Sequence, residues 1–157
     1  MQEKAISVKN LYKSYNGVKA VKGVSFDVEQ GEFFGYLGPN GAGKTTTINT
    51  ITGLANFDSG SVKVMGHDVV KDYLEARKLI GFSHQELFFD ISLNVRQILE
   101  FQGGYFGMKG EVLQSRVDEL LKFFNLKAKE RDWFRGLSGG MKRKLQIAKA
   151  LIHEPKI

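Results

Sequence analysis

The sequence predicts an α/β fold with strands in its first ninety residues and helices further along. An apolar run, EFFGYL at residues 32–37, is typical of a buried strand, and it leads through a glycine-rich segment into a helix candidate. Two strand patterns precede this run. From about Ser92, apolar residues recur at steps of three and four, which indicates amphipathic helices. A chain of 157 residues can bury one sizeable core.

The strand-rich part begins with AISVKNLYKSY at 5–15, where Ile6 and Val8 alternate with polar residues. Asn16-Gly17 then gives a strong hairpin-turn signal, and VSFDVE at 24–29 is a plausible later strand. Another turn at Gln30-Gly31 leads into the apolar run at 32–37. Together these segments predict a hairpin followed by a buried strand.

The following segments alternate between the two types of element. KTTTINTITGL at 44–54 is a helix candidate, with Gly53 near its end. SVKVM at 61–65 reads as a strand after the turn residues 58–60. DYLEARKLIGF at 72–82 passes from a helix to a short strand around residues 80–83.

The remaining segments are predicted to be helices. SLNVRQILEFQGGYF at 92–106 and EVLQSRVDELLKFFNL at 111–126 both have helical spacing, and the second has one apolar face that fits core packing. A last helix follows Ser138, and Pro155 cannot extend it. The apolar face at 111–126 consists of Leu113, Val117, Leu120, Leu121 and Phe124.

Composition excludes several classes of protein. There is no cysteine, so neither a disulfide framework nor a thiolate metal site is possible. No run of eighteen apolar residues predicts a membrane span, and the N-terminus has no apolar signal-peptide core. The net charge of +6 suits nucleic acid, an acidic membrane surface, a phosphorylated small molecule or an ordinary solvated surface, and does not choose among them.

The strongest chemical signal is the segment Gly38-Pro39-Asn40-Gly41-Ala42-Gly43-Lys44-Thr45, which matches the phosphate-binding loop G-x-x-x-x-G-K-[ST]. Glycines let the backbone curl so that N–H groups point at phosphate oxygens, and the following helix offers its positive end to the same anion. Lys44 can bridge the outer phosphates, and the Thr45 hydroxyl can ligate Mg²⁺. A glycine-rich turn with a surface lysine would also match the letters, but the strand before it and the helix after it favour a nucleotide site.

A second signal opens the last helix. Ser138 is a good N-cap residue, and Gly139 and Gly140 leave the helix start open to an anion. Alone, this pattern fits a simple capped helix. Together with a phosphate loop about a hundred residues earlier, it favours a second phosphate contact.

With these two motifs in place, the chain resembles the nucleotide-binding domain of an ATP-binding cassette (ABC) transporter. GPNGAGKTTT at 38–47 resembles the Walker A loop, and LSGGMKRKLQIAKAL at 137–151 resembles the signature motif and its helix. IGFSHQE at 80–86 resembles the Q-loop segment, and LYKSYNG at 11–17 the region of the adenine-stacking aromatic residue. The signature form, with GGYFG at 103–107 and HEPK at 153–156, most resembles ATP-binding subunits of ABC-2-type exporters.

The resemblance implies a P-loop NTPase core with an antiparallel β-subdomain and a helical subdomain. Residues 1–90 would hold the β-subdomain and the phosphate-loop part of the core, 91–137 the helical subdomain, and 138–157 the signature helix and the return to the core. The family's next strand is Walker B, so the chain resembles the N-terminal part of such a domain, truncated before that strand. Without the acidic residues of Walker B, we do not expect this chain alone to hydrolyse ATP.

The resemblance also implies the site residues. ATP and Mg²⁺ would be the ligands, Lys44 and Gln85 would serve catalysis, and Thr45 and Gln85 would hold Mg²⁺. Tyr15 would stack on adenine, although it could simply close the hairpin, and Gln85 could be an ordinary surface residue. The nucleotide-contacting residues would be Tyr15, Gly38, Pro39, Asn40, Gly41, Ala42, Gly43, Lys44, Thr45 and Thr46, with Ser138, Gly139 and Gly140 acting on the nucleotide of a second domain.

The expected partners are a second nucleotide-binding domain, in a head-to-tail dimer, and a membrane-embedded permease subunit. The protein would couple ATP hydrolysis to transport, with export expected, from the cytoplasmic face of the cell membrane. No nucleic acid is expected as a partner. Two other functions stay open: a soluble ABC ATPase acting on ribosomes or DNA, and a non-catalytic nucleotide-binding fragment.

Overall fold

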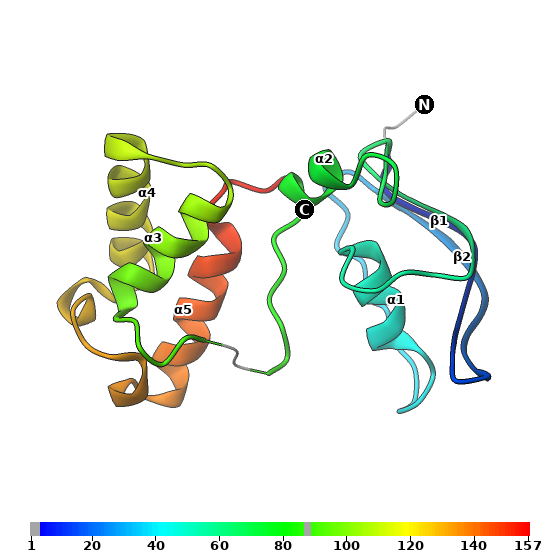
Figure 1. The fold of residues 1–157 in the computed structure, drawn as a ribbon, viewed down its shortest axis with the longest axis horizontal. Coiled ribbons are helices and arrows are strands. Elements are labelled where there is room, and N and C mark those ends of the chain that lie inside the picture. Colours follow the sequence, from blue (N-terminus) through cyan, green and yellow to red (C-terminus); the bar gives the residue numbers. More distant parts are fainter. Residues whose placement is uncertain (1–3, 87–88) are drawn as a thin grey trace. The chain divides into compact units, whose positions relative to one another are not determined.

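The computed structural model describes residues 4–86 and 89–157, and these divide into two compact units. Unit 1 comprises Met1–Ile80 together with Ile157, and unit 2 comprises Gly81–Lys156. Figure 1 shows strands and helices in unit 1, and a group of helices in unit 2. Each unit is described by itself below.

Unit 1 is built on an antiparallel sheet. Strands β1 (Lys4–Tyr15), β2 (Val18–Glu29), β3 (Ser59–Val64) and β4 (His67–Asp68) lie in the order β2-β1-β3-β4. The predicted hairpin is confirmed: Asn16 and Gly17 both have positive φ, at 47° and 81°, between paired strands. The second strand of the hairpin begins at Val18, six residues before the predicted segment 24–29.

Helices α1 (Lys44–Ile51) and α2 (Tyr73–Lys78) complete unit 1. The apolar faces of the strands and Ile51 of α1 form one buried cluster. The helices predicted at 44–54 and in 72–82 are confirmed, as is the strand predicted at 61–65. Buried members of the cluster are Val8, Leu11, Val21, Ile51, Val62, Val64, Val69 and Ala76.

Two predicted strands are wrong. Residues 32–37 and 80–83 form no strand, because no described strand pairs with either segment. In the first segment the side chains still alternate: Phe34 and Tyr36 stack on Phe26 at 5.2 and 5.3 Å between ring centroids, while Phe33 is fully exposed and Leu37 is 90% exposed. The apolar run therefore predicted the alternation of its side chains but not their burial.

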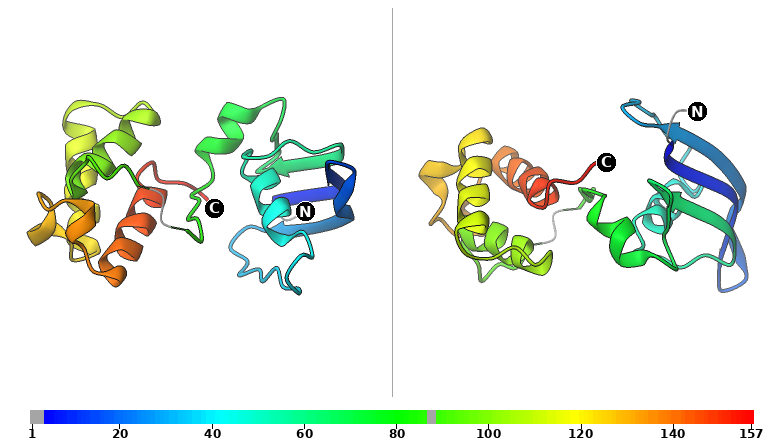
Figure 2. Two further views of the ribbon diagram at one scale, coloured as in Figure 1. Left: turned by 60° about the horizontal axis from the view of Figure 1, so that its bottom comes forward. Right: turned by 90° about the horizontal axis from the view of Figure 1, so that it is seen from above.

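Unit 2 is helical. Its elements are α3 (Val95–Tyr105), α4 (Gly110–Phe123), the 3₁₀ helices η1 (Lys127–Lys129) and η2 (Phe134–Gly136), and α5 (Gly139–Leu151). The three predicted helices are confirmed. Both views in Figure 2 show α3, α4 and α5 grouped together. Among the described residues, no helix combines the length and the apolar character that crossing a membrane would require.

The core of unit 2 joins the three helices. Leu99 of α3, Val117 and Leu121 of α4, and Leu145 of α5 are all fully buried. Of the face predicted at 111–126, Val117, Leu120 and Leu121 are buried, and Leu113 and Phe124 pack against the cluster while partly exposed. The predicted core face is therefore confirmed.

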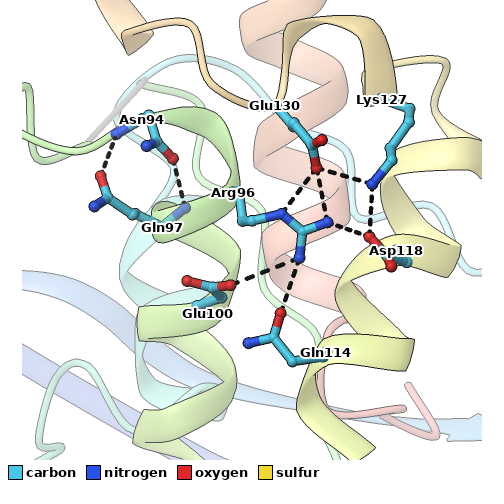
Figure 3. A network of polar contacts seen from close by, with 8 residues as sticks. All are labelled: Asn94, Arg96, Gln97, Glu100, Gln114, Asp118, Lys127 and Glu130. Carbon is cyan, nitrogen blue, oxygen red and sulfur yellow. Dashed lines mark hydrogen bonds and ion pairs between the residues drawn. The ribbon is translucent and has the colours of Figure 1, made fainter. Parts of the chain in front are cut away.

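A polar network holds α3 to α4 and η1 (Figure 3). Arg96 donates from Nε to Glu130 at 2.8 Å and from Nη1 to Gln114 at 2.9 Å, and its Nη2 contacts Asp118. Lys127 donates to both Asp118 and Glu130 at 2.9 Å. These paired charges tie the first turn of α3 to the middle of α4 and to η1.

The same picture shows how α3 begins. The Asn94 side chain accepts from the Gln97 backbone N–H at 2.9 Å, and the Gln97 side chain accepts from the Asn94 N–H at 3.0 Å. This reciprocal pair is a capping box, which satisfies two backbone donors that a helix start leaves free.

Candidate functional site

The predicted phosphate loop folds as a tight turn in unit 1. Gly41 and Gly43 both have φ of 82°, a conformation that side chains with a Cβ rarely adopt. The Ala42 N–H donates to the Pro39 carbonyl at 3.2 Å, and the ammonium group of Lys44 donates to the carbonyls of Gly38 and Pro39 at 2.7 Å each. Lys44 is therefore folded back over the loop, where a phosphate group would compete with the carbonyls for its N–H groups.

Gly43 connects the loop to the sheet. It is the N-cap of α1, and a Cβ at this position would overlap the carbonyl oxygen of Ala20 in β2. Its own carbonyl accepts from the Thr47 N–H at 2.9 Å and from the Thr47 hydroxyl at 3.0 Å. Only a residue without a side chain fits between the loop and the strand here.

The start of α1 favours an anion. Its first turn carries no acidic residue, so the free N–H groups and the helix dipole are not already neutralised by a neighbouring carboxylate. Lys44 and Thr45 open the helix, and the Thr45 side chain is exposed while that of Thr46 is partly buried. This combination of curled backbone, helix N-terminus and lysine can hold phosphate oxygens.

Tyr15 lies at the last position of β1, where it pairs with Val18 across the hairpin. Its side chain is 48% exposed, and the ammonium group of Lys13 lies 4.9 Å from the centre of its ring. The ring is therefore accessible to a ligand, although the ammonium group of Lys13 lies over it. Both interpretations of Tyr15, as an adenine contact and as a hairpin residue, fit this position.

The signature segment lies at the start of α5 in unit 2. Ser138 caps the helix, and its hydroxyl accepts from the Met141 N–H at 3.3 Å. Gly139 and Gly140 are exposed, and a Cβ added at either would meet open space. The first turn of α5 also lacks acidic residues, so this second helix start can accept an anion too.

Gln85 lies in unit 2, in irregular backbone ahead of the helices, and its side chain is exposed. The carbonyls on either side of it, those of His84 and Glu86, accept hydrogen bonds from Arg143 and Gln146 of α5. Sequence reasoning missed these two residues. The available signal was Gln146 itself, a polar residue between Leu145 and Ala148 on the apolar face of the helix.

The structure thus arranges the predicted site residues in two groups. The phosphate loop, Thr45, Thr46 and Tyr15 belong to unit 1, and Gln85 and the signature residues belong to unit 2. Within unit 1, the residues from Gly38 to Thr46 are contiguous. Within unit 2, α5 carries the signature residues at its start and holds the backbone at Gln85 by its middle.

A curled glycine loop that opens a helix and carries a lysine defines the class of P-loop nucleotide-binding proteins. The comparison with protein families then identifies the family. Residues 21–157 match the model described as ABC transporter, and the chain belongs to that family.

Relatives agree with this family and with the resemblance to exporter ATP-binding subunits. The chain is 40% identical over 157 residues to Nod factor export ATP-binding protein I of Paraburkholderia xenovorans, covering 100% of this chain and 52% of the relative. It is also 40% identical over 157 residues to daunorubicin resistance ATP-binding protein DrrA3 of Streptomyces coeruleorubidus, covering 100% of this chain and 50% of the relative. The chain therefore spans about half the length of the curated relatives it matches.

Solved structures confirm the fold class. One similar structure is an ATP-binding cassette described as dimeric, in a post-hydrolysis state with bound ADP and Pi. It superposes with a TM-score of 0.84 at 29% identity, and the match covers 96% of this chain and 70% of that one. The predicted ABC ATPase fold, with an antiparallel β part and a helical part, is confirmed.

Proposed function

We propose that this chain is the ATP-binding part of an ABC transporter subunit, and that the whole protein hydrolyses ATP to drive transport. The observation that carries the proposal is the loop at Gly38–Lys44, where curled backbone, an acid-free helix start and a lysine come together. Membership of the ABC transporter family supports it.

ATP would be held chiefly through its phosphates. The backbone N–H groups of the loop and the start of α1 would face phosphate oxygens, and Lys44 would exchange the carbonyls of Gly38 and Pro39 for the outer phosphates. Because Lys44 already lies over the loop, it needs only a local change of rotamer to do so. Tyr15 would supply a flat apolar surface for the base.

Mg²⁺ would be bound by neutral oxygen donors of this chain. Among the described residues, no cluster of three or more His, Asp or Glu side chains could hold a metal by itself. The Thr45 hydroxyl and the Gln85 amide oxygen are each the kind of ligand that suits a hard cation, whose remaining ligands would be phosphate and water. The bound ion would neutralise charge on the phosphates, while Gln85 would also orient the attacking water.

Ser138, Gly139 and Gly140 would act on a nucleotide held by a second domain. Their exposed, acid-free helix start supports this role, since a helix N-terminus of this kind attracts an anion. The similar structure described as a dimer with ADP and Pi supports a pairing of two such domains. ATP bound between the two domains would then hold them together.

The function of the whole protein would be transport of a substrate out of the cell. The relatives named for Nod factor export and daunorubicin resistance support this direction. A membrane-embedded permease subunit would carry the substrate, and this chain would lie on the cytoplasmic face of the membrane beside it. Hydrolysis would reopen the paired domains and pass that movement to the permease.

The test is the dependence of binding on the phosphate chain. The purified protein is titrated with fluorescent derivatives of ATP, ADP and AMP in the presence of Mg²⁺. A phosphate-loop site predicts similar binding of ATP and ADP, and AMP weaker by about tenfold or more, because AMP lacks the phosphates that meet the loop. Equal affinity for all three nucleotides would contradict the proposed site.

A further inference from the structure

Gln146 is a buried polar side chain that donates hydrogen bonds to the backbone on both sides of Gln85. It is 6% exposed and lies among the apolar residues of α5. Its amide nitrogen donates to the His84 carbonyl at 2.9 Å and to the Glu86 carbonyl at 2.8 Å. The amide group of Gln146 therefore donates to both of the carbonyls that flank Gln85.

Arg143 sets the orientation of that amide. Its Nη1 donates to the side-chain oxygen of Gln146 at 2.8 Å and to the His84 carbonyl at 2.8 Å. Because a guanidinium can only donate, it selects the oxygen end of the Gln146 amide and turns the nitrogen end toward the backbone of residues 84–86. The carbonyl of His84 thus receives two donors from neighbouring turns of one helix.

The beginning of this segment is also fitted to α5. A Cβ at Gly81 would lie 2.7 Å from the Ala150 carbonyl oxygen and 2.7 Å from Cγ of Pro155. Residues 81–86 therefore run along the helix, with Gly81 beside its end and Gln85 beside its middle. Since residues 81–86 form no helix or strand, hydrogen bonds of regular structure do not hold their backbone, and the contacts with α5 can do so.

We propose that Gln146 and Arg143 are positioning residues that tie the backbone at Gln85 to the signature helix. This inference rests on the proposed role of Gln85 as a Mg²⁺ ligand. The helix from Ser138 to Gln146 is continuous, so the start that meets one nucleotide and the clamp that holds Gln85 are about 12 Å apart on one rigid rod. A shift of α5 therefore moves Ser138 and Gln85 together.

The consequence is a link between two contacts that ATP makes. When α5 is drawn to a nucleotide through Ser138 and Gly140, the same helix carries the backbone at Gln85 with it. When the clamp is cut, Gln85 keeps its side chain but loses its fixed position, and metal binding has to order the segment first. The clamp acts through Gln85, and neither of its residues needs to touch the nucleotide.

The test compares ATP binding with Mg²⁺ and with EDTA in calorimetric titrations of the whole chain. Two variants cut the clamp: Gln146→Leu removes the amide, and Gln146→Glu keeps the size and the Arg143 partner but cannot donate to the carbonyls. The matched control is Gln114→Leu, which removes another glutamine of unit 2, one that accepts a hydrogen bond from Arg96. Circular dichroism checks that each variant is folded, and either clamp variant alone suffices for the test.

We expect both Gln146 variants to lose the Mg²⁺-dependent gain in affinity by about 10–100-fold, as Gln85→Ala does, with binding in EDTA unchanged. Gln114→Leu keeps the full gain. If Gln146 variants retain the gain that Gln85→Ala loses, the clamp does not position Gln85 and the inference is wrong. It is equally overturned if Gln85→Ala keeps the gain, or if the unaltered chain shows none. Failure of the proposed nucleotide site would give a different result, because ATP binding would then be absent or unaffected by Lys44→Ala.

Discussion

Arg96 is predicted to be the main polar support of unit 2. Its guanidinium joins α3 to α4 and η1, and its side chain is only 22% exposed. Replacing it with methionine keeps most of the aliphatic stem but removes every N–H donor of the group. The carboxylates of Asp118 and Glu130 would then keep Lys127 as their partner, and Gln114 would bind water instead of Arg96.

The size of the effect follows from the exposure of the network. Hydrogen bonds to charged groups contribute about 1.5–3 kcal/mol when well covered, whereas exposed ion pairs contribute about 0.2–1 kcal/mol. Arg96 is mostly covered, but its acidic partners reach solvent, so we count its whole set of contacts as one covered charge-assisted hydrogen bond and not as several. Arg96→Met should lower the free energy of unfolding of unit 2 by about 2 kcal/mol.

The assay is urea unfolding followed by tryptophan fluorescence. The chain has one tryptophan, Trp133, and it lies in unit 2 beside the network, where it bridges to Asn94. Arg135→Met is the matched control, since Arg135 is exposed on η2, and it should change stability by less than about 0.5 kcal/mol. Equal midpoints for Arg96→Met and the unaltered protein would refute the reasoning.

Acid should weaken the same network. Hydrogen bonds from Lys127 and Arg96 hold the pKa of Asp118 and the pKa of Glu130 below their ordinary values. A lowered pKa adds stability above the unfolded value, near pH 4, and that stability is lost as the pH falls through the folded value. The loss of stability between pH 5 and strongly acidic solution should therefore be smaller in Arg96→Met than in the unaltered protein.

Three further predictions concern the helix starts and the core. Ser138→Arg should leave ATP binding to one chain unchanged but block ATP-driven pairing of the nucleotide-binding domains of the whole protein, which size-exclusion chromatography would detect as a missing dimer peak. Gly43→Ala should abolish nucleotide binding in a fluorescence titration, because its Cβ would overlap the Ala20 carbonyl and its φ is positive; affinity equal to that of the unaltered chain would contradict the loop geometry. Leu145→Ala should cost unit 2 about 2–5 kcal/mol in urea unfolding, since this side chain is fully buried, and a cost below about 1 kcal/mol would contradict the packing.

Local signals predicted much of the fold. The turn at Asn16-Gly17, the helix that begins at Lys44 and the cap at Ser138 each depend on residues within one turn of one another, and all three are present. The phosphate loop was predictable for the same reason, because its glycines and its lysine lie within eight residues.

Contacts between distant segments were not predictable. Whether residues 32–37 form a strand depends on a pairing partner, which the apolar pattern cannot supply. Arg96 meets Asp118 and Glu130 across 22 and 34 residues, and Gln146 meets Glu86 across 60. The sequence shows that a charged or polar residue on the buried face of a helix needs a partner, but it does not show which distant residue that partner is. The domain boundaries at 90/91 and 137/138 stay predictions.

The most direct test of the central claim, that this chain binds ATP through the loop at Gly38–Lys44, is a calorimetric titration of ATP with Mg²⁺ into the unaltered chain and into Lys44→Ala. Removing the ammonium group removes a charge-assisted contact to phosphate, so the variant should bind ATP at least about tenfold more weakly. Its fold should be unchanged, because within the described part of the chain the Lys44 side chain donates to two carbonyls of the loop itself. Unchanged ATP affinity in a folded Lys44→Ala variant would contradict the assignment of the phosphate site.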